Sequence, residues 1–347
     1  MFDLNKLVRQ NILSLAPYSC ARNEFSGTAS VWLDANESPF NGPYNRYPDP
    51  LQKQVKERLS AIKGVDAERI FLGNGSDECI DLMYRVFCQP KVDNVVAIAP
   101  SYGMYEVCAD INDVEYRKVA LNDDYTINVD ALLAATDERT KVIWICSPNN
   151  PTGNAFPVAD IERVIKGFSG IVVVDEAYGE FSSQPSMRFR LNEFPNLLVM
   201  QTFSKAWGSA GVRLGMAFAS EAIIGLFNKV KYPYNVNMLT QQFALDHLAK
   251  LDDIKAWVDT LLSERTRLIN SLDALPQVET TFPTDANFVL ARVVDADDIY
   301  KHLQAQGIIV RNRNKVEKCL GCLRITVGTP EENDAVINGI SNYGTEQ

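Results

Sequence analysis

The sequence predicts an α/β protein with a large unit built on a parallel sheet and a smaller α/β unit made from both chain ends. Short apolar runs alternate with helical patterns over residues 50–235, which is typical of parallel strands joined by crossover helices. Beyond Pro276 the elements become shorter. We therefore expect a large domain at residues 40–238, and a small domain with an N-terminal arm formed by residues 1–39 and 239–347.

The large domain is expected to begin with a helix, because apolar residues lie at helical spacing between Leu51 and Ile62. A glycine-rich turn and a second helix follow, ending near Phe87. Several later apolar runs lack polar alternation, which is typical of strands buried on both faces. The expected strands lie at residues 95–100, 141–148, 171–178, 196–204 and 214–220.

The rest of the chain divides into a helical stretch, a small α/β unit and one irregular segment. From Asn237 a helical pattern runs for some 35 residues. The stretch 34–50 is too rich in proline, asparagine and glycine for a regular element, and loops of that length are often functional. In the small unit we expect strands near 286–293, 308–311 and 323–328, and helices near 296–306 and 331–343.

Composition excludes several classes of protein. The 347 residues include 34 basic and 44 acidic side chains, and a net charge of −10 argues against nucleic acid or an anionic membrane as a partner. The longest apolar runs are far shorter than the roughly 20 residues of a membrane span. Seven scattered cysteines favour reduced thiols and a cytoplasmic location. Cys319 and Cys322 form a CxxC pair, but no second pair completes a zinc site, so we expect no metal.

A lysine stands directly after a buried strand in the run TFSKAWGSAGVRLG at 202–215. A partly desolvated lysine loses its proton more easily and forms Schiff bases with carbonyl compounds, which is one interpretation of Lys205. Eight residues later, the planar guanidinium of Arg213 suits a phosphate. The alternative from this segment alone is a loop lysine and an arginine in a salt bridge.

Two further segments place polar side chains after strands. Asp175 ends the run VVVD at the carboxyl edge of the expected sheet, where ligands of open α/β folds bind, and a buried carboxylate there needs a cationic partner. Tyr178 follows three residues later, and Asn150 lies in the turn SPNNPTG. A helix-capping aspartate, a core tyrosine and simple turn residues are the structural alternatives, and a Walker-B-like metal site is disfavoured because the chain has no phosphate loop.

A glycine-rich turn, GNGSDE at 73–78, precedes the second helix and would offer its free amide groups to an anion. The best-placed residues are Gly75, Ser76 and Asp77. Because a carboxylate repels a phosphate, we expect the Asp77 side chain to turn away and cap the helix. Tyr102 follows a strand and would stack on a flat ring, although a single tyrosine in this position is more often a core residue.

Each feature alone is ambiguous, but their set and order resemble the fold-type-I pyridoxal-5′-phosphate-dependent aminotransferases. The resemblance implies a mostly parallel seven-stranded sheet between helices in the large domain. It also implies that Lys205 forms the internal aldimine and moves a proton, and that Asp175 keeps the pyridine nitrogen protonated. Tyr178 and Asn150 would bind the ring oxygen. The residues placed around the phosphate are Gly75, Ser76, Asp77, Thr202, Ser204 and Arg213.

Further motifs resemble one family within this fold, the histidinol-phosphate aminotransferases. They are APYSCAR, LDANESPF, NRYPDP, ANF, GIIVRNRNK and CLRITVGTPEEN, and they extend over nearly the whole chain. The resemblance implies a cytoplasmic homodimer of histidine biosynthesis that moves an amino group between glutamate and histidinol phosphate. It implies that Tyr47 reaches the neighbouring subunit's cofactor site. The positions expected near the substrate are Tyr18, Asn36, Tyr47, Asn150, Arg311 and Arg324.

A pair of arginines suits both substrates, because guanidinium groups bind a phosphate or a carboxylate. Arg313 lies two residues after Arg311 and shares its strand face, so the sequence leaves open which of the two faces the substrate. The alternative functions are a broad-specificity aromatic aminotransferase, a related phospho-amino-acid decarboxylase, and a regulator or inactive protein that only binds the cofactor. Retention of Lys205, Asp175 and Arg213 argues against an inactive protein.

Overall fold

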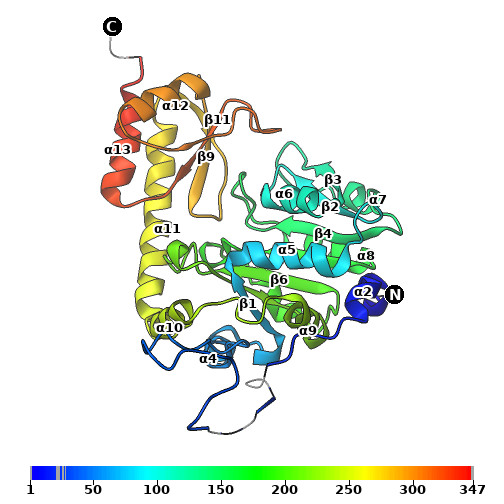
Figure 1. Cartoon of the computed structure of the whole chain (residues 1–347). Helices are drawn as coiled ribbons and strands as arrows, with labels where there is room; N and C mark the ends of the chain where they lie inside the picture. The colour runs from blue at the N-terminus through cyan, green and yellow to red at the C-terminus, as the bar shows by residue number, and fades with distance from the viewer. Residues whose placement is uncertain (1, 21–23, 26, 28, 345–347) are drawn as a thin grey trace.

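The structure is a computed structural model that describes residues 2–20, 24–25, 27 and 29–344. A seven-stranded sheet forms the centre of the larger unit, with the order β1-β7-β6-β5-β4-β2-β3 (Figure 1). All neighbours in this sheet are parallel except those of β7, which runs antiparallel to both β1 and β6. Its strands are β1 (Ile70–Asn74), β2 (Asn94–Ala99), β3 (Glu115–Ala120), β4 (Thr140–Cys146), β5 (Ile171–Asp175), β6 (Leu197–Thr202) and β7 (Leu214–Phe218). This confirms the expected mostly parallel seven-stranded sheet.

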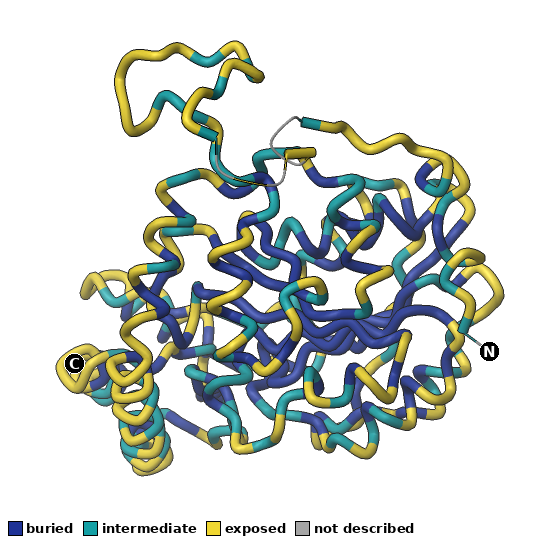
Figure 2. Tube along the Cα trace, turned by 90° about the horizontal axis from the view of Figure 1, so that it is seen from below, coloured by how far each residue is buried: buried dark blue, intermediate teal, exposed yellow. Residues whose placement is uncertain are grey.

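Helices cover both faces of this sheet, because all its strands except the edge strand β3 are mainly apolar on both sides. Val172 and Val174 of β5 face one core and Val173 faces the other. Figure 2 shows the sheet as a buried layer through the middle of the molecule. The helices packed on one face include α4 (Lys53–Lys63), α7 (Val129–Ala134), α8 (Val158–Gly167) and α10 (Met238–His247), and those on the other are α5 (Gly75–Phe87), α6 (Met104–Ile111) and α9 (Glu221–Val230).

The smaller unit is an antiparallel sheet with the order β10-β11-β9-β8, covered by helices. The long helix α11 (Leu251–Asp273) runs from the large unit to the small one and packs on β8 and β9 (Figure 1). The remaining elements are β8 (Val278–Thr281), β9 (Phe288–Val293), α12 (Ala296–Ala305), β10 (Arg311–Asn312), β11 (Cys322–Thr326) and α13 (Pro330–Ser341).

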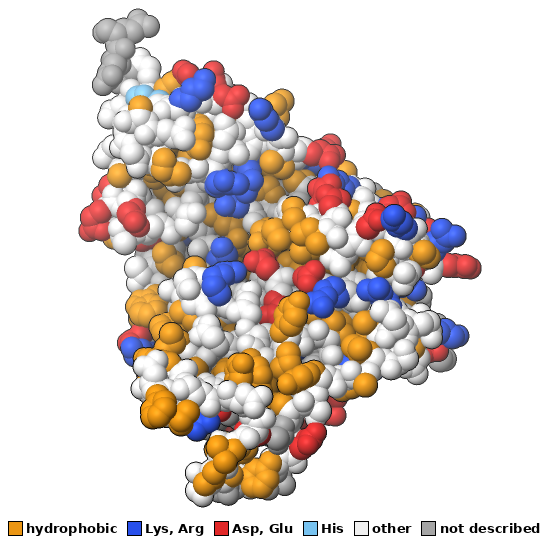
Figure 3. All heavy atoms as spheres, viewed as in Figure 1, with side chains coloured by type: hydrophobic (Ala, Val, Ile, Leu, Met, Phe, Trp, Pro, Cys, Tyr) orange, Lys and Arg blue, Asp and Glu red, His pale blue; other side chains and the backbone are white. Residues whose placement is uncertain are grey.

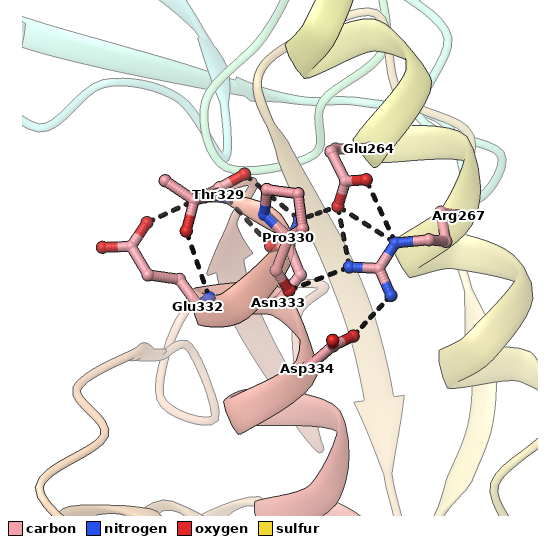
Figure 4. A network of polar contacts seen from close by, with 8 residues as sticks. Glu264, Arg267, Thr329, Pro330, Glu332, Asn333 and Asp334 are labelled. Carbon is pink, nitrogen blue, oxygen red and sulfur yellow. Dashed lines mark hydrogen bonds and ion pairs between the residues drawn. The ribbon is translucent and has the colours of Figure 1, made fainter.

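A polar network ties the end of β11 to two helices (Figure 4). Thr329 and Glu332 form a capping box at the start of α13. The buried Asn333 accepts a hydrogen bond from the Gly328 amide at 2.9 Å and donates to Glu264 of α11 at 2.8 Å. Glu264 also pairs with Arg267, which binds the Pro330 carbonyl at 3.0 Å. The network therefore fixes the segment that leaves β11.

Some expected elements are shorter in the structure. The strand expected at 308–311 is wrong except at Arg311, because the Ile308 amide still donates to Leu303 and closes the end of α12. The strand expected at 171–178 ends at Asp175, and the helical stretch beginning at Asn237 is two helices, α10 and α11.

The chain begins with two short helices, α1 (Leu4–Leu7) and α2 (Gln10–Leu13). Val8 and Ile12 join the core beneath α5, so this segment packs on the large unit. Residues 29–49 then extend away from the body as an exposed loop (Figures 1 and 2). The proposed domain boundaries near residues 40 and 239 stay a prediction. Within the described ranges, no helix has the length and apolar character needed to cross a membrane.

Candidate active site

A cavity of about 670 Å³ lies where the small sheet faces the carboxyl ends of the large sheet's strands. Loops after β2, β4, β5 and β6 form its floor, and β10 and β11 supply the opposite wall. Figure 3 shows this face hollowed between the two units, with Lys and Arg side chains on both sides of the hollow. The edge at which parallel strands end is the usual ligand site of an open α/β sheet.

Lys205 lies in the loop after β6, and its side chain opens into the cavity. The Gly208 amide donates to the Lys205 carbonyl at 2.9 Å, and the Ser209 amide donates to Phe203 at 3.0 Å, which fixes the loop. The Lys205 Nζ lies 5.5 Å from the ring centroid of Tyr178. Partial burial and the nearby positive charge of Arg324 lower the pKa of Lys205. Its amine is thus closer to the neutral, nucleophilic form than that of an exposed lysine.

Asp175 is the last residue of β5 and is only 2% exposed. Tyr105 donates its hydroxyl hydrogen to Asp175 Oδ2 at 2.7 Å, and the Ala177 amide donates to Oδ1 at 3.0 Å. Burial raises the pKa of Asp175 to about 6 in spite of these two hydrogen bonds. Across the residues that the structure covers, no side chain forms a salt bridge with this carboxylate. A ligand with a positively charged group would therefore bind favourably beside it.

An anion site lies at the start of α5. Gly75 has a left-handed φ of +72°, and a Cβ built there would lie 2.5 Å from Arg213 Nη2. A Cβ on Gly215 of β7 would lie 2.3 Å from the backbone of Gly75 and Ser76. These two glycines therefore let Arg213 and β7 approach the first turn of α5, where free amide groups favour an anion.

The expected position of the Asp77 side chain is wrong. Asp77 accepts hydrogen bonds from the Tyr102 hydroxyl at 3.1 Å and from Arg213 Nη2 at 3.2 Å, so it faces the cavity. The capping contact is made instead by Glu78, which accepts from the Asn74 amide at 2.6 Å. The reason is a contact that is distant in the sequence: the side chain of Asp77 forms an ion pair with Arg213, whose positive charge attracts it.

Asn150 connects the two walls of the cavity, because its Oδ1 accepts a hydrogen bond from Arg324 Nη1. The neighbouring Asn149 is fully buried and donates to the Pro100 carbonyl at 3.0 Å and to Thr152 at 2.8 Å, which holds the loop. Arg324 also lies over the ring of Phe288, 5.1 Å from its centroid. The small sheet and the NPTG loop thus meet directly at this contact.

The structure brings most of the predicted site residues together. Those lining the cavity are Ser76, Asp77, Tyr102, Asn150, Asp175, Tyr178, Thr202, Ser204, Lys205, Arg213, Arg311 and Arg324. Gly75 lies beneath Arg213. Tyr18, Asn36 and Tyr47 lie in the N-terminal arm and are not among the residues that line this cavity. Tyr47 instead stacks on Tyr234 at a centroid distance of 4.4 Å. The last two residues of the APYSCAR motif lie outside the described residues.

One functional contact was not expected from the sequence, and one question that the sequence left open is answered by the structure. Tyr105 of α6 donates a hydrogen bond to Asp175, and no local sequence pattern indicates this contact, because the two residues lie 70 positions apart. The sequence left open whether Arg311 or Arg313 faces the site. In the structure both side chains line the cavity.

Comparisons with known proteins agree with this geometry. The family model for aminotransferase class I and II matches residues 14–340. The chain is 58% identical to a histidinol-phosphate aminotransferase of Bacteroides fragilis, over 99% of this chain and all of the relative. It is 56% identical to one of Parabacteroides distasonis, over 99% of both chains. The solved histidinol-phosphate aminotransferase of Sinorhizobium meliloti in complex with pyridoxal-5′-phosphate shares the fold, with a TM-score of 0.80 at 23% identity, over 87% of this chain and 83% of that one.

Proposed function

This chain belongs to the class I and II aminotransferases and, within them, to the histidinol-phosphate aminotransferases, and we propose that it performs that family's reaction. The amino group moves between glutamate and the imidazole-acetol phosphate that becomes histidinol phosphate, a step of histidine biosynthesis. One observation carries the proposal: a lysine of lowered pKa and a buried carboxylate with no described cationic partner face one cavity whose opposite wall is lined by arginines.

The cavity fits pyridoxal phosphate as the cofactor. The unpaired Asp175 suits a protonated pyridine nitrogen, and the cradle over Gly75, with Arg213 and the hydroxyls of Thr202 and Ser204, suits a phosphate. When bound, this cofactor withdraws electrons from the substrate's α-carbon and so makes the proton on that carbon acidic.

Lys205 is the residue we assign to proton transfer. Partial burial and the charge of Arg324 lower the pKa of its Nζ, which favours the neutral amine that would accept the proton from the substrate's α-carbon. Tyr178 stands beside it with a hydroxyl whose pKa is raised by burial, so this group stays protonated and donates a hydrogen bond. With a pKa of about 6, the Asp175 carboxyl is mostly ionised at neutral pH, and a cation bound beside it would favour the charged form further.

Arg324 and Arg311 are the residues we assign to the anionic end of both substrates. They lie directly opposite each other in the antiparallel register of β10 and β11, so their side chains share one face of the small sheet. Histidinol phosphate carries a phosphate and glutamate carries two carboxylates, and a guanidinium group binds either kind of anion. One pair of arginines therefore serves two substrates that bind in turn.

We also assign the N-terminal arm to a second copy of the chain, within a cytoplasmic homodimer. Exposed apolar residues concentrate in this arm, where Tyr18, Leu33, Phe40 and Tyr44 are between 64% and 89% exposed. A protein rarely leaves such a surface uncovered. The resemblance to dimeric aminotransferases supports the arm as the part that brings Tyr47 to the partner's cavity, with Tyr18 and Asn36 near its substrate.

Mixed dimers test this assignment. A Lys205→Ala chain and a Tyr47→Ala chain are each expected to lose most activity. A dimer of one copy of each contains one site with both residues, provided that Tyr47 crosses to the partner. Half of the dimers in a fully exchanged equimolar mixture are hybrids with one active site of two, so activity should rise on mixing to about a quarter of that of the same amount of wild-type dimer. No gain in a mixture that has exchanged subunits would place Tyr47 in its own chain's site.

Growth of a histidine-auxotrophic strain that lacks its own enzyme tests the function. The wild-type chain should restore growth without histidine, whereas Lys205→Ala, expressed to the same level, should not. Growth would not be restored by an aromatic aminotransferase that does not act on imidazole-acetol phosphate, by a decarboxylase or by a protein that only binds the cofactor. Failure of the soluble, cofactor-loaded wild-type chain would overturn the proposed function.

A further inference from the structure

Three arginines lie on the face of the small sheet that forms one wall of the cavity. Arg311 pairs with Arg324 across β10 and β11. Arg313 lies two residues beyond Arg311 and therefore follows the same face, because side chains alternate along extended backbone. All three line the cavity.

The backbone around Arg313 is held on both sides. Asn312 and Asn314 donate their side-chain amides to the two carboxylate oxygens of Asp297 on α12, at 2.7 and 3.0 Å. The Arg313 amide donates to the Cys322 carbonyl of β11 at 2.9 Å. The alternate residues thus anchor this turn to α12, and the anchoring directs Arg313 to the opposite side, towards the cavity.

The positive charges of this wall are not balanced within the described chain. None of the salt bridges between described residues involves Arg311, Arg313 or Arg324, and the Nε atoms of Arg313 and Arg324 are buried without an acceptor. Asn150, which binds Arg324, is neutral. Burial, together with the charges of Arg324 and Arg311, lowers the pKa of Arg313 to about 10, so it stays protonated at neutral pH. Arg313 and Arg324 are half-buried and Arg311 is exposed, so three positive charges without an ion-pair partner among the described residues face one cavity, which favours an anion of more than one charge.

We infer that Arg313 is a substrate-binding residue that sets the preference for a phosphate monoester or a dicarboxylate over a substrate with a single carboxylate. The inference rests on the proposed function and deepens it. A phosphate monoester carries nearly two negative charges and three acceptor oxygens at neutral pH, which suits a third guanidinium beside the Arg311–Arg324 pair. An aromatic amino acid brings one carboxylate, which leaves part of the charge on this wall unmatched.

The test compares Arg313→Gln with wild type in the cofactor-loaded enzyme, with 2-oxoglutarate as acceptor. The kcat/KM for histidinol phosphate should fall about 10- to 100-fold, mostly through KM, as expected for a lost charge-assisted contact. The kcat/KM for phenylalanine should change less than about threefold, since its single carboxylate has one charge and two acceptor oxygens, which the Arg311–Arg324 pair binds without Arg313. Arg313→Lys, which keeps the charge but not the fork, should lie between the two.

Arg292→Gln is the matched control. Arg292 lies on the neighbouring strand β9, stacks 5.3 Å from the ring centroid of Phe282 and is not among the residues that line the cavity. Arg292→Gln removes one positive charge from the same small sheet. It should leave the ratio of kcat/KM for histidinol phosphate to that for phenylalanine unchanged. Binding of histidinol phosphate to Lys205→Ala with and without Arg313→Gln, measured by calorimetry, gives a second readout that does not depend on turnover.

The outcomes separate the inference from the proposed function. A fall in kcat/KM for histidinol phosphate that spares phenylalanine supports the inference. An unchanged ratio in Arg313→Gln, or an equal loss for both substrates, overturns it while the proposed function stands. A wild-type enzyme that shows no preference for histidinol phosphate over phenylalanine overturns both.

Discussion

The raised pKa of Asp175 predicts that its carboxylate lowers the free energy of unfolding of the cofactor-free protein, and Asp175→Asn tests by how much. Burial raises the pKa of this carboxyl from about 3.8 to about 6. A shift of about two units corresponds to roughly 3 kcal/mol, since each unit is about 1.36 kcal/mol. Asparagine removes the charge but leaves the Tyr105 hydroxyl without its acceptor, which costs about 1 kcal/mol. The net gain expected at pH 8 is therefore about 2 kcal/mol.

The sign of the pH dependence follows from the direction of the shift. The folded-state pKa lies above the unfolded one, so folding favours the protonated carboxyl, and wild type loses stability as the pH rises from about 4 to about 6. Above about pH 6 wild type has lost this stability completely, and below about pH 4 it retains all of it. The advantage of Asp175→Asn should thus be largest at pH 7 to 8 and should vanish or reverse near pH 4.

Urea unfolding of cofactor-free wild type and Asp175→Asn, at matched protein concentration and at pH 8 and pH 4, measures both effects. Added pyridoxal phosphate should stabilise wild type more than the variant, because only the carboxylate pairs with the ring nitrogen. Turnover by the variant should fall about 100-fold or more. A variant less stable than wild type at pH 8 without cofactor would refute the reasoning.

Three further substitutions test other parts of the account. Arg324→Ala should weaken the binding of both glutamate and histidinol phosphate by about 2–4 kcal/mol, measured by steady-state kinetics. An effect on only one of the two substrates would mean that their anionic groups bind at separate sites. Gly215→Ala places a Cβ 2.3 Å from the backbone of Gly75, so the affinity for pyridoxal phosphate, measured by fluorescence titration, should fall at least 10-fold; unchanged affinity would argue against the cradle. Asn333→Ala should lower the free energy of unfolding by about 2 kcal/mol in urea, whereas Asn338→Ala, exposed on the same helix, should change it by less than about 0.5 kcal/mol; equal effects would show that the buried network adds nothing.

The sequence predicts β2, β4, β5, β6 and β7 because these strands are buried on both faces, whereas no strand is expected at the partly exposed edge strand β3 or at the short β1. A run such as Ile171–Asp175 is apolar throughout and ends in a charged residue, so both the strand and the functional position at its end are visible in one line of sequence. Lys205, Asp175 and Arg213 were found because each follows or precedes such a strand. The strand β10 is short and leaves no comparable pattern, because residues 306–308 still close α12.

Contacts between distant segments could not be predicted from local patterns. Asp77 faces Arg213, which lies 136 positions later in the chain, and Tyr105 reaches Asp175 across 70 positions. The expectation that Asp77 would cap α5 used only the neighbouring residues, among which Glu78 fills that role equally well. The side on which Arg313 lies likewise depends on Asp297 of another helix.

The most direct measurement is the ratio of kcat/KM for histidinol phosphate to that for phenylalanine, on purified wild-type protein loaded with pyridoxal phosphate and with 2-oxoglutarate as acceptor. The account predicts a preference of at least about 100-fold for histidinol phosphate, because the arginine-lined wall matches a doubly charged group. Equal or reversed values would leave the fold and the role of Lys205 intact but would contradict the assignment of the substrate.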